Sequence, residues 1–281
     1  MFFFVLIFSS FFFLIGKVYE DPWGYLIIGL LISLVSSIGS YYFSDKLILM
    51  TVRAIPADKR EYFNYYTVAE NLAISSGLSM PKLYVIEDDS PNAFATGRDN
   101  KHAIVCATTG LLEMMNRGEL EGVIGHELSH IKNYDMLVMS IVSVLVGTIA
   151  LISDWVIRRI WWGRSNREER SNTNPIFYLL FIIALILTPL VATLIQLSIS
   201  RKREFLADAS SALLTRNPKG LITALQKLNE YNRPLASATN STAHLFIVNP
   251  LKQDKSLMSK FSNLFSTHPP IEERIKILRS I

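Results

Sequence analysis

Cysteine is nearly absent from this chain: its 281 residues include one, Cys106. A single cysteine excludes an intrachain disulfide framework and cysteine-rich zinc modules, so His and carboxylate side chains would have to hold any bound metal. Charge is scarce too, at 19% of residues against about 25% in an average soluble chain. No basic stretch alternates with aromatics as in nucleic-acid-binding proteins, so we predict no nucleic-acid partner. Half of the residues are hydrophobic and the mean hydropathy is +0.28, which indicates a membrane protein with a sizeable polar part.

Four runs of the sequence carry no charge: Phe2–Gly16, Trp23–Phe43, Met136–Ser153 and Pro175–Ser200. A helix needs about 20 apolar residues to cross the hydrocarbon core of a bilayer. The second and fourth runs are long enough to span the bilayer. The third run reaches that length if its helix continues past Asp154 to Ile157. The first run is short, but it lacks the basic start and small-residue cleavage site of a signal peptide, so an anchor is favoured. We therefore predict four membrane-spanning helices.

Lys and Arg are unevenly distributed around these runs. With four spans, the two polar regions lie on one side of the membrane, and they hold all but six of the 28 Lys and Arg residues. The positive-inside rule then places them in the cytoplasm, although a hairpin loop with five arginines at 158–170 opposes this. We expect a multi-pass protein of the cytoplasmic membrane. Its predicted parts are a transmembrane hairpin at 1–44, a cytoplasmic part at 45–135, a second hairpin at 136–200 and a second cytoplasmic part at 201–281.

The predicted fold class is mainly α, with a four-helix transmembrane region and an α+β cytoplasmic domain. Periodicity and turn residues predict the elements of the cytoplasmic domain. Residues 88–100 and 232–268 are rich in turn formers and are predicted to be loops. The expected strands are 82–86 and 103–107, and the expected helices are 57–76, 119–132, 201–215 and 218–231.

The most informative motif is His-Glu-Leu-Ser-His at residues 126–130. On a helix, His126 and His130 lie about 40° apart in rotation and one turn apart in height, so both imidazoles can reach one metal ion. Glu127 points elsewhere on the helix but can reach a water at the metal and accept its proton. This H-E-x-x-H arrangement is typical of zinc peptidases.

A catalytic zinc site needs a third protein ligand. Glu204 and Asp208 are four residues apart on one predicted helix. His130 precedes the third run and Glu204 follows the fourth, at about 9 and about 6 Å from the run ends, so the two can meet if the runs are adjacent. Spacing alone also allows Glu204 to pair with Arg201 or Arg203. Asp208 suits an acceptor that orients a ligand histidine, or it is a surface carboxylate.

The chain resembles the HtpX-like membrane zinc metallopeptidases, relatives of the CAAX prenyl proteases. The resemblance covers most of the chain, and it implies a zincin-like (gluzincin) catalytic domain with one Zn²⁺ per chain and Glu204 as the third ligand. It also implies a peptidase that acts on protein substrates, misfolded membrane proteins among them, from a site facing the cytoplasm. The matching segments are Pro91–Gly97, Glu119–His130 with Asn133 and Asp135, Ser200–Asp208 and Thr267–Pro270.

The same resemblance suggests roles for three further residues. Asn92 and Ala93 match the edge strand that aligns an extended substrate, although an asparagine after Pro91 also suits a turn. His268 matches a family histidine near the zinc that can donate to the developing oxyanion, although it also suits a loop before a helix that starts at prolines. Three residues match nothing functional and are interpreted as structural: His102, His244 and Cys106.

Three other functions compete with this hypothesis. Prenyl-protein processing is the nearest, but relatives with that activity have more than four spans. An intramembrane protease would bury its motif in a span, whereas charged residues surround this one. A non-catalytic adaptor or transporter with a structural zinc would usually carry ionisable residues within its spans, and the four runs carry none before Asp154.

Overall fold

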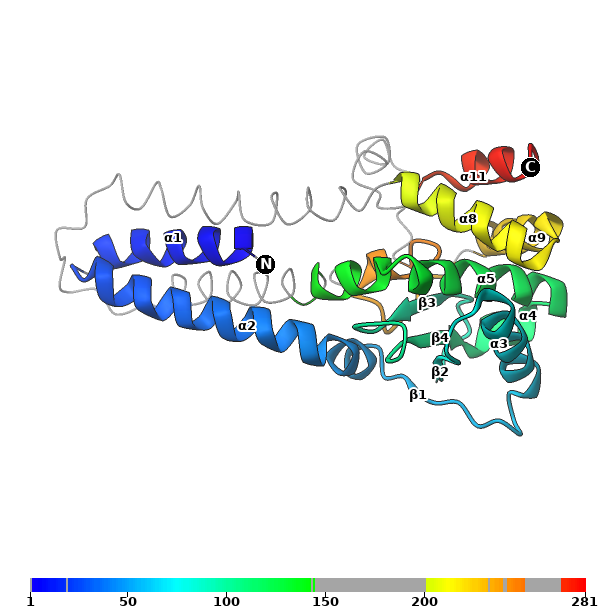
Figure 1. Cartoon of the computed structure of the whole chain (residues 1–281), viewed down its shortest axis with the longest axis horizontal. Helices are drawn as coiled ribbons and strands as arrows, with labels where there is room; N and C mark the ends of the chain where they lie inside the picture. Colours follow the sequence, from blue (N-terminus) through cyan, green and yellow to red (C-terminus); the bar gives the residue numbers. More distant parts are fainter. Residues whose placement is uncertain are drawn as a thin grey trace. The chain divides into compact units, whose positions relative to one another are not determined.

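The computed structural model describes residues 2–18, 20–142, 144, 201–231, 233–239, 242–250 and 269–281 (Figure 1). It divides into two compact units, one formed by residues 1–42 and 141–195 and the other by 43–140 and 196–281. The fourth hydrophobic run, more than half of the third, the arginine-rich loop at 158–170 and His268 lie outside the described residues.

The first unit contains α1 (Phe2–Val18) and most of α2 (Pro22–Thr51). Pro22 suits the first turn of α2, and the Asp21 carboxylate caps that turn by accepting from the Gly24 amide at 2.9 Å. Across the interface between the two helices, a Cβ on Gly29 would lie 2.6 Å from the Cβ of Phe12, so the helices pack closely. Within the part of the chain that the structure describes, α2 is the one helix long and apolar enough to cross a membrane.

The second unit is built around a four-stranded mixed sheet in the order β1-β2-β4-β3. β2 and β4 pair in parallel, while β1 and β3 pair antiparallel to β2 and β4 respectively. β4 is entirely buried, and its interior position explains its unbroken apolar sequence. β3 therefore forms one edge of the sheet. The strands are β1 (Ile55–Pro56), β2 (Lys82–Ile86), β3 (Ala93–Thr96) and β4 (Ile104–Thr108).

Helix α5 (Arg117–Lys132) packs against the sheet and against α8 and α9 (Figure 1). Its start is fixed by a capping box, in which Asn116 and Glu119 each accept a hydrogen bond from the backbone amide of the other, and Lys227 pairs with Glu119 at 2.7 Å. The remaining helices of this unit are α3 (Phe63–Ser76), α4 (Thr109–Met114), α8 (Arg201–Thr215), α9 (Pro218–Glu230), the 3₁₀ turn η2 (Ala243–Leu245) and α11 (Ile271–Leu278).

Most predicted helices and strands begin and end within one or two residues of their predicted bounds. One predicted helix and one predicted loop differ from the structure. The helix predicted from residue 57 begins at Phe63, because the Asp58 carboxylate binds the amides of Arg60 and Glu61 and forms a turn there. The predicted loop at 88–100 contains β3, a four-residue strand that its partner β4 stabilises by pairing. Part of the predicted loop at 232–268 is also packed, since Phe246 and Ile247 are buried.

Two glycines let α5 approach its neighbours closely. A Cβ on Gly122 would lie 2.6 Å from the backbone nitrogen of Leu221 in α9. A Cβ on Gly125 would lie 2.8 Å from the hydroxyl of Ser211 in α8, and that hydroxyl donates to the Gly122 carbonyl at 2.7 Å. The close crossing of α5 with α8 and α9 therefore depends on the absence of a side chain at Gly122 and at Gly125.

Gly122→Ala is expected to destabilise the protein by about 1–3 kcal/mol, because the added methyl group overlaps backbone that can move only with α9. Thermal or denaturant unfolding measures the effect. Gly118→Ala is the control on the same helix, because its Cβ would meet only side-chain atoms of Asn116 and Asn217. Equal stability of the two variants would contradict this account of the crossing.

Candidate metal centre and active site

Helix α5 carries the H-E-x-x-H motif into the interior of the second unit. His126, Glu127 and His130 are all buried, although they belong to the most polar part of the helix. Burial of three titratable side chains is costly unless each finds a partner or a metal. The groups that contact these three side chains therefore determine their chemistry.

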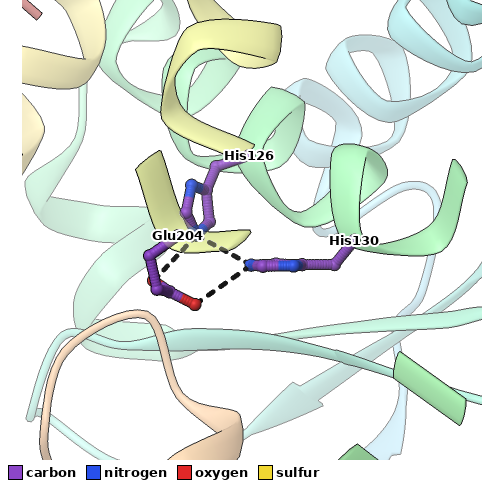
Figure 2. A group of neighbouring side chains, drawn as sticks. All are labelled: His126, His130 and Glu204. Carbon is purple, nitrogen blue, oxygen red and sulfur yellow. Dashed lines mark hydrogen bonds and ion pairs between the residues drawn. The ribbon is translucent and has the colours of Figure 1, made fainter. Parts of the chain in front are cut away.

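The structure brings Glu204 of α8 to the two histidines, as Figure 2 shows. The Nε2 atoms of His126 and His130 are 3.2 Å apart, and the Glu204 carboxylate oxygens lie 3.7 Å from the first and 3.4 Å from the second. All three donor atoms lie within 4.8 Å of one another. Glu204 is thus directed into the motif, and not toward solvent with its arginine neighbours.

A second carboxylate orients each of the two imidazole rings. Asp208 lies 2.9 Å from Nδ1 of His126, and Asp135 lies 3.2 Å from Nδ1 of His130. A carboxylate acceptor keeps the proton on Nδ1, which leaves the Nε2 lone pair available. The predicted position of Asp208 behind a ligand histidine agrees with this geometry, and Asp135 takes the equivalent position behind the other ring.

Arg274 of α11 is a buried site residue that the sequence reasoning missed. Its guanidinium donates to both oxygens of Asp208, at 2.8 and 2.7 Å, and to the Ile247 carbonyl at 2.9 Å. It also lies 3.7 Å from Glu204. The sequence did contain an indication, since Arg274 falls within the apolar stripe of α11 that Ile271, Ile275 and Leu278 form.

The electrostatics of the site favour positive charge at the centre and negative charge around it. Burial would raise the pKa of Asp208, but the charge and hydrogen bonds of Arg274 bring it down to about 2. Burial would lower the pKa of His130, but hydrogen bonds to Asp135 and Glu204 raise it to about 10. For His126, burial outweighs Asp208 and its pKa is lowered. The surrounding carboxylates thus favour positive charge at His130.

Glu127 lies between the metal cluster and the edge strand β3. Burial is the largest cause that raises the pKa of Glu127, to about 7. The charge of His130 opposes this rise, and the charge of Glu204 adds to it. The backbone amide of Ala95 donates a hydrogen bond to the Glu127 carboxylate. Ala95 is in β3. The proposed base therefore lies next to the strand for which the family resemblance implied a role in substrate alignment.

The start of β3 is bonded to the segment after η2. The Asn92 side chain donates to the Val248 carbonyl at 2.9 Å, and the Ala93 carbonyl accepts from the Ile247 amide at 2.9 Å. Asn92 is buried, so its side chain supports this part of the fold. The segment also connects to the metal centre, since Arg274 binds the carbonyl of Ile247.

The three residues interpreted as structural are not members of the group formed by His126, His130 and Glu204. Cys106 is buried in β4, where burial raises the pKa of its thiol. His244 is buried and its Nε2 lies 3.2 Å from the Met139 carbonyl. His102 is on the surface with Nδ1 2.7 Å from Asp99.

The donor set fits a divalent metal ion. Two imidazole nitrogens and one carboxylate converge, and the opposite nitrogen of each ring is already held by an aspartate. Three protein ligands with room for a further one are typical of catalytic zinc sites. Within the described parts of the chain, this is the one group of His, Cys, Asp and Glu side chains that could hold a metal ion.

The sequence model of Peptidase family M48 matches residues 64–281, which include every residue of this cluster. The chain belongs to peptidase family M48. This M48 peptidase is 43% identical to "Protease HtpX homolog" of Caldanaerobacter subterraneus subsp. tengcongensis over 286 residues, covering 99% of this chain and 93% of that protein. It is 46% identical to the protein of the same name from Tropheryma whipplei (strain Twist) over 241 residues, covering 86% and 80%.

A solved structure described as "Crystal Structure of S. mikatae Ste24p" has a similar fold. Its TM-score is 0.52 at 19% sequence identity, and the match covers 97% of this chain but 62% of that one. The family predicted from the sequence motifs is therefore confirmed, and with it a membrane metallopeptidase. An adaptor without enzymatic activity is excluded by the same findings.

Proposed function

We propose that this M48 peptidase is a zinc endopeptidase of the cytoplasmic membrane that cleaves misfolded membrane proteins. His126, His130 and Glu204 would hold one zinc ion per chain, and Glu127 would serve as the general base. The observation that carries the proposal is the convergence of three metal-binding atoms within 4.8 Å beside a buried glutamate.

The residues around the cluster have distinct tasks in peptide hydrolysis. His126, His130 and Glu204 would hold the zinc, which when bound would supply Lewis-acid chemistry for the scissile carbonyl and a water of pKa about 7. The Glu127 carboxylate accepts the proton of the attacking water and delivers it to the leaving amine. Asp208 and Asp135 each lie at hydrogen-bond distance from the Nδ1 atom of one histidine ring, and they would direct its Nε2 atom toward a bound metal. His268, which lies outside the described residues, is proposed to donate to the developing oxyanion.

Substrate alignment is proposed for β3, with Asn92 and Ala93 at its start. β3 is an edge strand, and an extended peptide can add to such an edge through backbone hydrogen bonds. The hydrogen bond from the Ala95 amide to Glu127 supports this assignment, because it brings the proposed base close to the strand. A bound peptide would therefore present its carbonyl groups close to the metal cluster.

The membrane arrangement extends the same proposal. Transmembrane hairpins at 1–44 and 136–200 would carry the cytoplasmic parts at 45–135 and 201–281. Supporting observations are the length and apolar character of α2 and the concentration of Lys and Arg in the polar regions. Both polar regions contribute to one metal cluster, which requires them to lie on the same side of the membrane.

Metal analysis of the purified full-length protein tests the proposed site. We expect about one zinc per chain, loss of casein cleavage on chelation, and recovery when zinc is restored. Glu204→Gln and His130→Ala are expected to retain little zinc and little activity, because each removes one of three ligands.

Glu230→Gln is the matched control, since Glu230 is an exposed glutamate at the end of α9, and it should bind zinc as the unaltered protein does. Full zinc content in both ligand variants would show that the metal is held elsewhere and would refute the proposed site.

A further inference from the structure

The two histidines of the metal cluster are supported in different ways. Behind His126, Asp208 is paired with Arg274, which is fully buried. Behind His130, Asp135 is paired with Arg203, whose side chain is 49% exposed. The second pair, Asp135–Arg203, contains neither a proposed metal ligand nor the proposed base, and the function proposed above gives Arg203 no role.

Asp135 uses both of its oxygens. Oδ2 lies 3.2 Å from Nδ1 of His130, while Oδ1 accepts a hydrogen bond from Nη1 of Arg203. The side chain of Asp135 is 2% exposed, so its charge is largely removed from solvent. A guanidinium that is bonded to a buried carboxylate fixes the orientation of that carboxylate, and the carboxylate in turn fixes the ring to which it is bonded.

The Asp135–Arg203 pair also links two helices, because of where the two residues lie in the chain. Arg203 directly precedes the proposed ligand Glu204 in the first turn of α8. Asp135 follows the end of α5 at Lys132, after a turn in which Tyr134 adopts a φ of 59°. The pair therefore joins the end of α5 to the start of α8, next to one ligand from each helix.

We propose that the Asp135–Arg203 pair is a positioning device for the metal site. It holds the His130 ring and the start of α8 in register, with the His130 and Glu204 donor atoms 3.4 Å apart. A pre-organised ligand set binds metal more tightly, because less conformational freedom is lost on binding. The inference rests on the proposed zinc site, which it deepens.

Zinc affinity of the full-length protein in detergent tests the proposal. Arg203→Ala and Asp135→Asn are each expected to weaken zinc binding about 10- to 100-fold, the usual effect of losing a group that orients a metal ligand. Arg203→Lys keeps the charge and should retain affinity within about threefold of the unaltered protein. Lys202→Ala removes an adjacent exposed charge and should leave the affinity unchanged.

The double variant Asp135→Asn/Arg203→Ala separates a pair from two independent residues. If the two act as a unit, the double variant binds zinc about as weakly as Asp135→Asn alone, since non-additivity reveals coupling. Multiplying effects would overturn the proposal. A second result would also overturn it: Arg203→Ala lowers the unfolding temperature of the metal-free protein but binds zinc within threefold of the unaltered protein. The pair would then serve stability alone.

The same titration distinguishes failure of this inference from failure of the zinc site. If His130→Ala loses zinc while Arg203→Ala keeps full affinity, the site stands and the pair has no positioning role. If His130→Ala binds zinc with unchanged affinity, the proposed site is wrong and the inference falls with it.

Discussion

Glu127→Gln is expected to lower casein cleavage by about 10²- to 10⁴-fold, the usual contribution of a general base. Glutamine has nearly the same shape as glutamate but cannot accept a proton from water. Its amide oxygen can still accept the hydrogen bond from the Ala95 amide, so the fold around the site should persist. Glu127 lies outside the proposed ligand set, and we expect the variant to keep about one zinc per chain.

Cleavage rates and metal content should be measured on the same preparation. Glu121→Gln is a suitable control, because it replaces a partly exposed glutamate on the same helix that pairs with Arg117 at 3.1 Å. We expect the control to cleave at the original rate. Undiminished cleavage by Glu127→Gln would show that another group accepts the proton.

Arg274→Leu is expected to reduce the free energy of unfolding by about 3–5 kcal/mol, because it leaves the buried Asp208 carboxylate without its guanidinium partner. Asp208 and Arg274 are both fully buried and joined by two hydrogen bonds. For a unit of this size, the loss corresponds to a fall in Tm of about 6–20 °C. The carbonyl of Ile247 and the oxygens of Glu204 also lose a neighbouring cation.

Three further variants isolate the cause of that destabilisation. Lys276→Leu makes a similar change at an exposed position of α11 and should alter Tm little. Arg274→Lys keeps the charge but loses the forked hydrogen bonds, so an intermediate Tm is expected. Arg274→Leu combined with Asp208→Asn removes the uncompensated charge and should recover part of the loss. An Arg274→Leu protein as stable as the original would contradict a structural role for this pair.

Local sequence was sufficient for most of the elements around the metal centre. The helices at 119–132 and 201–215 follow from periodicity, and α5 is further fixed by its capping box. Periodicity and turn residues predicted a loop at 93–96, although the family resemblance implied an edge strand at Asn92 and Ala93. Four residues beside turn formers have little strand preference of their own and pair only once β4 is in place. The start of α3 was misplaced by six residues, because a side-chain turn at Asp58 competes with the helix.

The sequence by itself determined the membrane character, the metallopeptidase family and the spacing of His126, Glu127 and His130, because these depend on composition and on the geometry of one helix. Tertiary structure alone decided which distant groups complete the site. It brought Glu204 to the two histidines and placed Asp135 and Asp208 behind them, and it buried Arg274 against Asp208. Except for Asp135 and His130, which are five residues apart, these contacts join elements that are far apart in the chain. They form because a buried charge requires an opposite charge, and only the packing of α5, α8 and α11 determines which one is within reach.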